Sequence, residues 1–264
     1  MIDRVRLDAI IREAGRMALA GWPGDGHALE VWEKTPGNPV SEADLVVDAY
    51  LKRELSALLP AAGWLSEETA DAPHRLGGDL AWLVDPIDGT RDYVRGRDGW
   101  CVSVALVNTS RPLFGYLFAP ARKRDEGGEF WHGEAGKGSW RNGERLKASK
   151  RLELSGARVP AQHVPEEDSD LVMVEQPNSI ALRMAKVASD EADLVATLRW
   201  GFEWDIAAAA LIAREAGAAV TDAFGNPLNY NKPDPRAFGV LATSPGIHDA
   251  AVARLTGRAK ALSN

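Results

Sequence analysis

Apolar residues recur at intervals of three and four in two stretches near the start of the chain, which is the spacing of one helical face. The first stretch covers residues 4–20, and the glycines and proline of residues 21–24 predict its end. The second covers residues 41–59 and begins with Ser41 as a helix cap. The glycine and prolines of residues 36–39 predict a loop between the two helices.

The pattern then changes to short apolar runs bounded by turn residues, which predict strands. Such runs lie at residues 81–84, 101–107 and 113–118, and the glycine-rich stretch 127–142 predicts short strands joined by hairpins. Helical patterns return at 180–189 and 206–217, and they alternate with expected strands near 171–174 and 239–242. This order of elements predicts an α/β (α+β) fold.

A chain of 264 residues, of which 45% are hydrophobic and 26% charged, can form one large domain or two compact ones. We divide it into an N-terminal α+β subdomain, residues 1–145, and a C-terminal α/β subdomain, residues 146–264. The single cysteine, Cys101, and the nine tryptophans are expected in the core. The start lacks the apolar core of a signal peptide, and no stretch approaches the ~20 apolar residues of a membrane span. We therefore expect a cytoplasmic protein with no membrane partner.

The net charge of −7 argues against nucleic acid as a partner, because nucleic-acid-binding proteins usually carry a basic face. Such a charge can simply maintain solubility. Clustered carboxylates are also how a protein holds Mg²⁺, so the positions of the acidic residues decide between these interpretations.

The clearest acidic motif is the run Asp85-Pro86-Ile87-Asp88-Gly89-Thr90, which follows an apolar strand directly. Ligand sites of open α/β sheets usually lie at such strand ends. The proline and glycine predict a turn that brings Asp88 beside Asp85, and two carboxylates so close repel each other unless a cation lies between them. With the Ile87 carbonyl they would form an all-oxygen site suited to Mg²⁺. Taken alone, a turn of this kind is also common in structural loops.

Two further segments carry acidic residues in comparable settings. Glu67 follows the apolar residues Trp64 and Leu65, although paired glutamates such as Glu67 and Glu68 are usually solvated surface. Asp205 precedes a run of alanines and can equally be the N-cap of a helix. The alanines would allow that helix to pack closely against a sheet.

Together these segments resemble the inositol monophosphatase family, a group of lithium-sensitive, Mg²⁺-dependent phosphomonoesterases. The resemblance spans nearly the whole chain and includes, in the family's order, residues 66–68, 82–93, 136–143 and 204–217. It implies the layered αβαβα sandwich of the inositol monophosphatase and fructose-1,6-bisphosphatase type. It also implies a homodimer with two or three Mg²⁺ ions per active site.

The same resemblance implies a set of metal ligands. Glu67, Asp85 and the Ile87 carbonyl would bind one ion, and a third, weaker ion would lie near Glu67. A second ion would be bound by Asp85, Asp88 and Asp205.

The reaction that the resemblance implies is an in-line attack on phosphorus by metal-activated water. Thr90 would position this water, and Asp44 would orient the Thr90 hydroxyl and accept a proton. The backbone N–H groups of Gly89 and Thr90 would hold a phosphate oxygen, as glycine-containing anion nests do.

The chain departs from many relatives at the expected substrate positions. Arg91, Arg95 and Arg97 form either a basic surface loop or a grip on a second anionic group of the substrate. Asn178 and Ser179 occupy the place of a Gly-Thr-Ala stretch that contacts the sugar alcohol in inositol phosphatases. No carboxylate occurs in residues 198–201, near which those enzymes place an acidic contact to inositol. We expect the substrate contacts to come from Asp88, Gly89, Thr90, Arg95, Arg97, Asn178, Ser179 and Asp205.

These features predict a phosphoric monoester hydrolase that is similar to inositol monophosphatase and acts on a small phosphorylated metabolite. A 3′(2′),5′-bisphosphate nucleotidase acting on adenosine bisphosphates is the alternative, and a fructose bisphosphatase is a more distant one. A non-catalytic regulatory binding protein on the same fold is a further alternative from a different class. Loss of a metal ligand would be its signature, yet every ligand position named above holds a usable residue.

Overall fold

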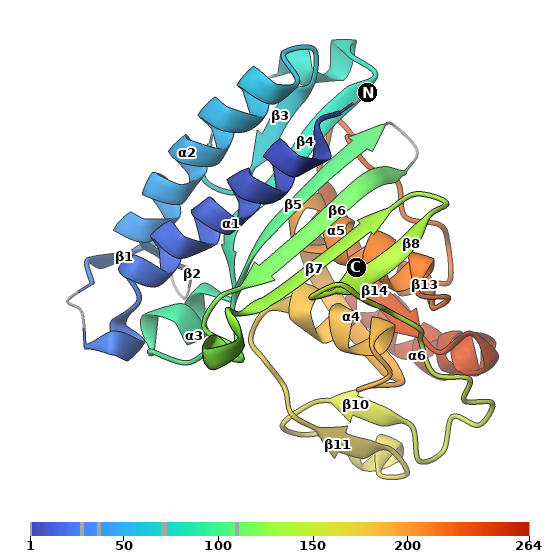
Figure 1. The fold of residues 1–264 in the computed structure, drawn as a ribbon. Helices are drawn as coiled ribbons and strands as arrows, with labels where there is room; N and C mark the ends of the chain where they lie inside the picture. The colour runs from blue at the N-terminus through green and yellow to red at the C-terminus, as the bar shows by residue number, and fades with distance from the viewer. Residues whose placement is uncertain (1, 27–28, 36–37, 70–72, 109–110, 264) are drawn as a thin grey trace.

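The computed structural model describes residues 2–26, 29–35, 38–69, 73–108 and 111–263, and within them the elements stack in five layers (Figure 1). The helices are α1 (Arg4–Ala20), α2 (Glu42–Leu58), α3 (Thr90–Val94), α4 (Ile180–Ala188), α5 (Glu203–Glu215) and α6 (His248–Leu262). Helices α1 and α2 cover one face of a large sheet, and α4 and α5 lie between that sheet and a smaller one. Helix α6 packs on the outer face of the smaller sheet. The predicted αβαβα sandwich is confirmed.

The large sheet has seven strands in the order β3-β4-β5-β6-β7-β8-β9. Its strands are β3 (Gly63–Ser66), β4 (Leu80–Asp88), β5 (Cys101–Asn108), β6 (Pro112–Ala119), β7 (Glu129–Glu134), β8 (Gly138–Arg141) and β9 (Glu144–Arg145). Strand β3 is parallel to β4, and every other neighbouring pair is antiparallel. The sheet therefore comes from one continuous part of the chain that ends at Arg145, where we propose the subdomain boundary.

The other strands form three smaller sheets. Strands β12 (Leu194–Phe202), β14 (Arg236–Thr243) and β13 (Ala219–Thr221) make an antiparallel sheet in that order. A hairpin pairs β1 (Val31–Thr35) with β2 (Asn38–Ser41), and a parallel pair joins β10 (Arg158–Pro160) to β11 (Val172–Val174). The three-stranded sheet is the second β layer of the sandwich.

Helix α5 is the central packing element, because it contacts both β layers. Its residues 206–213 are all buried, and four successive alanines lie among them. The small side chains allow close approach: a Cβ added to Gly115 on β6 would lie 2.6 Å from the Ala208 carbonyl oxygen. The expected tight packing of the alanine run is confirmed, and the Ser103 hydroxyl of β5 donates to the Trp204 carbonyl in the first turn of α5.

The structure confirms most elements that the hydrophobic pattern predicts, including both N-terminal helices and the buried Cys101. The loop predicted at residues 36–39 is wrong for Asn38 and Pro39, which lie in β2, and residues 36–37 lie outside the described residues. The core prediction is wrong for Trp32 and Trp200, whose surfaces are 42% and 53% exposed.

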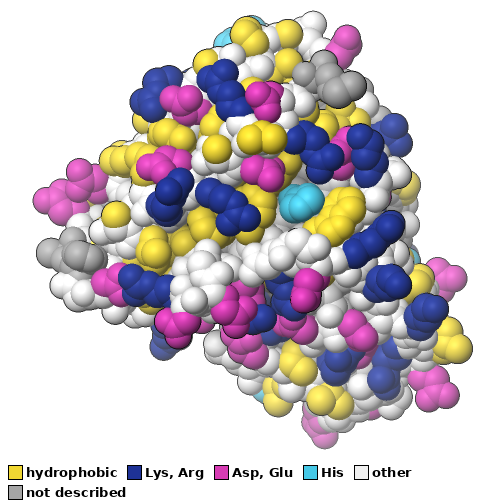
Figure 2. All heavy atoms as spheres, viewed as in Figure 1, with side chains coloured by type: hydrophobic (Ala, Val, Ile, Leu, Met, Phe, Trp, Pro, Cys, Tyr) yellow, Lys and Arg dark blue, Asp and Glu magenta, His cyan; other side chains and the backbone are white. Residues whose placement is uncertain are grey.

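On the face that carries α1 and α2, acidic and basic side chains are interspersed, and apolar patches lie between them (Figure 2). No helix in the described part of the chain combines the length and the apolar character needed to cross a membrane.

Asp193 anchors the segment that leads from β9 to β10 and is buried at the start of β12. Its carboxylate accepts hydrogen bonds from the Arg158 backbone N–H (2.9 Å), the Arg158 guanidinium and the Ser149 hydroxyl (2.6 Å). We expect Asp193→Ala to lower the free energy of unfolding by about 2–3 kcal/mol, because it leaves these donors unsatisfied. Chemical denaturation measures this change.

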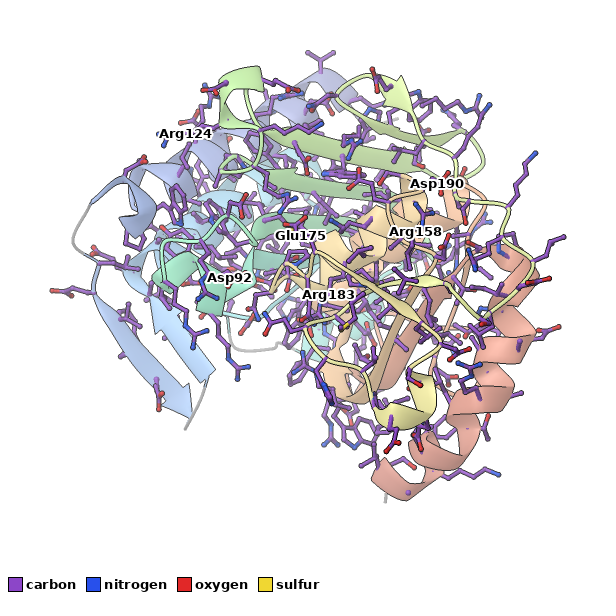
Figure 3. The ribbon with its side chains drawn as sticks, turned by 90° about the horizontal axis from the view of Figure 1, so that it is seen from below. Asp92, Arg124, Arg158, Glu175, Arg183 and Asp190 are labelled. Carbon is purple, nitrogen blue, oxygen red and sulfur yellow. The ribbon has the colours of Figure 1, made fainter. Side chains whose placement is uncertain are left out.

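Asp190→Asn is the matched control, because Asp190 bonds the outer end of the same guanidinium, is 54% exposed, and has a φ of +61°, which Asn tolerates (Figure 3). This substitution should lower the free energy of unfolding by less than about 1 kcal/mol. Burial alone would raise the pKa of Asp193, but the bonds from Arg158 and Ser149 outweigh it and lower that pKa. The difference between wild type and Asp193→Ala should therefore shrink as the pH falls below about 4. A pH-independent difference would contradict this account.

Candidate metal centre

Asp85 and Asp88 lie in the last four residues of β4, where they share a cavity with residues of α4 and α5. The strand continues through the motif, with Asp85 opposite Ser103 and Asp88 opposite Cys101, and the register shifts between the two pairs. The predicted turn is therefore wrong, because the chain from Asp85 to Asp88 forms a β-bulge in the strand. A bulge tolerates a proline and changes the direction of the side chains. The Ile87 N–H donates to Asp85 Oδ1 at 3.0 Å and stabilises the bulge.

Glu67 comes from the neighbouring strand, directly after the end of β3. Because β3 and β4 are parallel, their carboxyl ends meet at the same edge, and the Glu67 N–H donates to the Val84 carbonyl at 3.2 Å. Asp48 on α2 accepts hydrogen bonds from the hydroxyls of Ser66 and Thr69. These bonds hold both sides of the loop that carries Glu67.

Asp205 lies in the first turn of α5, but the N-cap of this helix is Phe202, so the prediction that Asp205 is the N-cap is wrong. Asp205 is the N3 residue, and its Oδ2 accepts a hydrogen bond from the Phe202 N–H at 3.0 Å, as in a capping box. Its carboxylate also reaches the cluster: one oxygen each of Glu67, Asp85 and Asp205 lies within 4.8 Å of the other two.

Burial and the mutual repulsion of the carboxylates dominate the electrostatics of this cluster. Burial, followed by the charges of Glu67, Asp88 and Asp205, raises the pKa of Asp85 well above its usual range. Burial and the charges of Asp88 and Glu67 do the same to the pKa of Asp205. Hard divalent cations prefer such oxygen ligands, and a bound cation would remove the repulsion. The donor set therefore fits Mg²⁺.

Asp88 connects the cluster to α4. Its Oδ2 accepts hydrogen bonds from the Ser179 hydroxyl and from the Ala181 N–H, the latter at 2.8 Å, while burial raises its pKa to about 6. The Ser179 hydroxyl in turn accepts from the Leu182 N–H at 2.9 Å, and Ser179 is fully buried. These contacts give Ser179 a role in positioning Asp88, while its predicted contact with the substrate stays a prediction.

Gly89 is needed where the chain turns from β4 into α3. Its φ of +97° is in the left-handed region, and an added Cβ would lie 2.7 Å from the Gly99 carbonyl oxygen and 2.9 Å from the Ser179 nitrogen. No side chain fits there without displacing backbone. The close approach presses the start of α3 against the segment that precedes α4.

Thr90 is the first residue of α3, and Asp44 lies in the first turn of α2. The Thr90 hydroxyl donates to the Ile87 carbonyl at 3.0 Å. Asp44 Oδ2 accepts from the Ser41 N–H at 2.8 Å and from the Ser41 hydroxyl at 2.6 Å, as a cap of α2. The negative charge of Asp44 also contributes to the raised pKa of Asp85. The predicted pairing of Thr90 with Asp44 stays a prediction.

Two cavities open beside the cluster, and they reveal residues that the sequence did not single out. One, of about 440 Å³, has Arg199 together with the exposed rings of Trp200 and Phe202 in its wall. The other, of about 300 Å³, includes Arg183 of α4 in addition to Arg95 and Arg97. The one feature of the sequence that points to Arg199 is its place in residues 198–201. Inositol phosphatases have an acidic contact to inositol near this place, and this chain has an arginine there.

A layered αβαβα fold with carboxylates of three segments gathered at a strand end is the arrangement of a metal-dependent phosphatase. The chain belongs to the inositol monophosphatase family, because the family's profile matches residues 3–261. The resemblance drawn from the sequence is confirmed. The chain is accordingly a phosphatase of small phosphorylated substrates, and its carboxylate cluster can hold the metal on which this family depends.

Relatives within the family carry names of different specificity. An inositol-1-monophosphatase of Mesorhizobium japonicum is 33% identical over 81% of this chain and 82% of its own length. A 3′(2′),5′-bisphosphate nucleotidase, CysQ, of Escherichia coli is 29% identical over 87% of this chain and 94% of its own. Among solved structures, an IMPase of Thermotoga maritima superposes with a TM-score of 0.82 at 26% identity and covers 99% of this chain and 100% of that one.

Proposed function

We propose that this chain is a Mg²⁺-dependent phosphomonoesterase that hydrolyses a small phosphate ester at the Glu67–Asp85–Asp205 cluster. The observation that carries the proposal is the convergence of these three carboxylates within 4.8 Å. Asp85 would ligate two ions, with Glu67 and the Ile87 carbonyl completing one site. Asp88 and Asp205 would complete the other, and a third, weaker ion would lie near Glu67. Bound Mg²⁺ would polarise the phosphate ester and lower the pKa of a water molecule.

The protein's own groups would orient the reactants. Thr90 would position the attacking water through its hydroxyl, and Asp44 would accept the proton. The N–H groups of Gly89 and Thr90 would hold a phosphate oxygen, and Asn178, which lines the cavity above the carboxylates, would contact the ester. Asp88 and Asp205 would also face the substrate, so the metal ligands and substrate contacts overlap.

The organic part of the ester would occupy the 440 Å³ cavity, which shares Glu67, Arg91 and Asp205 with the cavity over the metal ligands. Its wall combines a cation, Arg199, with aromatic rings, and Phe202 stacks on Trp204 with ring centroids 4.4 Å apart. Such a wall suits a substrate with an anionic group and a flat or apolar face. It favours a nucleotide or an acidic sugar phosphate over inositol.

The test is phosphate release from a panel of inositol monophosphates, sugar phosphates and adenosine bisphosphates, with Mg²⁺, with Mg²⁺ plus Li⁺, and with EDTA. We expect Mg²⁺-dependent release from at least one substrate and inhibition by Li⁺. Asp85→Asn protein purified identically controls for contaminating phosphatases. Absence of release across the panel would overturn the proposal and favour a regulatory binding protein. The proposed homodimer is tested separately by light scattering.

A further inference from the structure

A cavity of about 300 Å³ adjoins the metal centre and concentrates positive charge. We call it the arginine pocket; its lining includes Arg91, Arg95, Arg97 and Arg183, together with Asp92, Gln162, Gln176, Pro177 and Asn178. Four guanidinium groups thus share the lining with one carboxylate. The arginine pocket also shares Arg91 and Asn178 with the cavity over Asp85 and Asp88, so the two spaces are adjacent.

The single carboxylate of the arginine pocket is already committed to structure. Asp92 Oδ2 accepts a hydrogen bond from the Asn178 N–H at 3.0 Å, and Oδ1 lies 3.8 Å from an Arg97 nitrogen. Asp92 therefore ties α3 to the segment before α4 and balances part of one arginine. Within the described residues Asp92 forms no salt bridge with Arg95 or Arg183, which line the same pocket.

Arg183 projects from α4 near Asp92 (Figure 3) and is the most constrained of the four arginines. Its Nε and Nη2 donate to the carbonyls of Ser179 (3.3 Å) and Asn178 (2.9 Å), which fixes the plane of the guanidinium. Within the described residues neither Arg183 nor Arg95 forms a salt bridge with a carboxylate.

Burial lowers the pKa of Arg183, the charge of Arg199 adds to this, and Asp88 and Asp92 oppose it. A partly buried cation held only by backbone carbonyls is a costly arrangement, and an anion that reaches it would relieve the cost. Guanidinium groups match the geometry of phosphate oxygens, and bonds between two ionised groups are the stronger kind.

We propose that the arginine pocket binds a second phosphate of the substrate while the ester phosphate lies at the carboxylate cluster. This inference rests on the proposed phosphomonoesterase function and narrows its substrate class to small molecules that carry two phosphates. Arg183 is the fixed member of this second site, and Arg95 and Arg97 line it from the segment after α3.

The experiment compares substrates that share one scissile ester and differ only in a second phosphate. Adenosine 3′-monophosphate and adenosine 3′,5′-bisphosphate form one pair, and fructose 1-phosphate and fructose 1,6-bisphosphate form another. In wild type we expect higher kcat/KM for the bisphosphate of at least one pair. Arg183→Gln and Arg95→Gln should each lower the ratio of bisphosphate to monophosphate kcat/KM about tenfold.

Arg53→Gln, which removes an exposed arginine of α2, is the matched control and should leave the ratio unchanged. Arg183 also supports the segment that positions Asp88 through Ser179. Damage to that segment would lower kcat/KM equally for both substrates. Arg95 has no such contact, so its variant keeps the test decisive. The proposal would be overturned if Arg95→Gln lowered kcat/KM equally for the bisphosphate and the monophosphate. It would also be overturned if only Arg199→Gln lowered the ratio of bisphosphate to monophosphate kcat/KM. If wild type hydrolyses neither substrate class with Mg²⁺, the proposed function itself has failed.

Discussion

Replacing Asp205 with Asn should lower kcat/KM for phosphate release about a thousandfold and, at the same time, stabilise the metal-free protein. The loss in rate corresponds to about 4 kcal/mol of transition-state stabilisation, the scale expected when a metal ligand is removed. The gain in stability arises because Asp205 lies in a partly buried group of carboxylates that repel one another. Asn is nearly isosteric and keeps the oxygen that accepts from the Phe202 N–H, so the cap of α5 survives.

Activity assays and thermal unfolding with EDTA and with Mg²⁺ measure the two effects together. Relief of about 1 kcal/mol of repulsion should raise the melting temperature in EDTA by about 2–4 °C. Mg²⁺ should raise the wild-type melting temperature through preferential binding to the folded state, and this rise should be smaller in the variant. Asp249→Asn, in the exposed first turn of α6, is the control and should show neither effect. A variant that is inactive but less stable in EDTA would mean that Asp205 is chiefly structural.

The sequence predicted best those parts of the fold whose signal is local. The buried faces of α1 and α2 repeat with a helical period, and β5 is apolar along nearly its whole length, so each pattern is complete within a few turns or one strand. Helix α6 was missed because its buried residues are Ala251, Leu255 and Ala259, a four-residue spacing with only one large side chain. Strand β12 was missed because polar residues and a register shift between Thr197 and Trp200 break its alternation.

The same distinction explains which site residues could be predicted. Asp85 and Asp88 stand at the end of an apolar strand, where sequence position alone suggests a site. Arg183 is a polar position on an amphipathic helix, and nothing within α4 distinguishes it from a surface arginine. Its significance comes from the contact between α3 and the segment before α4, where the Asn178 N–H donates to Asp92, and which brings Arg183 to a cavity with Arg91 and Arg95, far away in the chain. Contacts of this kind depend on tertiary structure and have no local signature.

Thr90→Val should lower kcat about a hundredfold and change KM little. Valine replaces the hydroxyl by a methyl group of similar size, so the change removes the donor that we assign to the attacking water and keeps the start of α3 filled. A loss of this size is typical when a group that positions or moves a proton in the transition state is removed. Thr90→Ser keeps the hydroxyl and should retain most of the activity. If Thr90→Ser were as impaired as Thr90→Val, the methyl group, and not the hydroxyl, would be the important feature.

The pairing of Thr90 with Asp44 can be tested by combining substitutions. Asp44→Asn keeps an oxygen that can accept from the Ser41 N–H, so the cap of α2 should be retained, and thermal unfolding checks this. If Thr90 and Asp44 act as one unit on the same water, the double variant should be no slower than the slower single variant, because either change alone disables the unit. If they act independently and Asp44→Asn also lowers kcat about a hundredfold, the two losses should multiply to about ten-thousandfold. A multiplicative loss in a normally folded double variant would separate the two residues and leave the proton acceptor to be sought among the other carboxylates around Asp85.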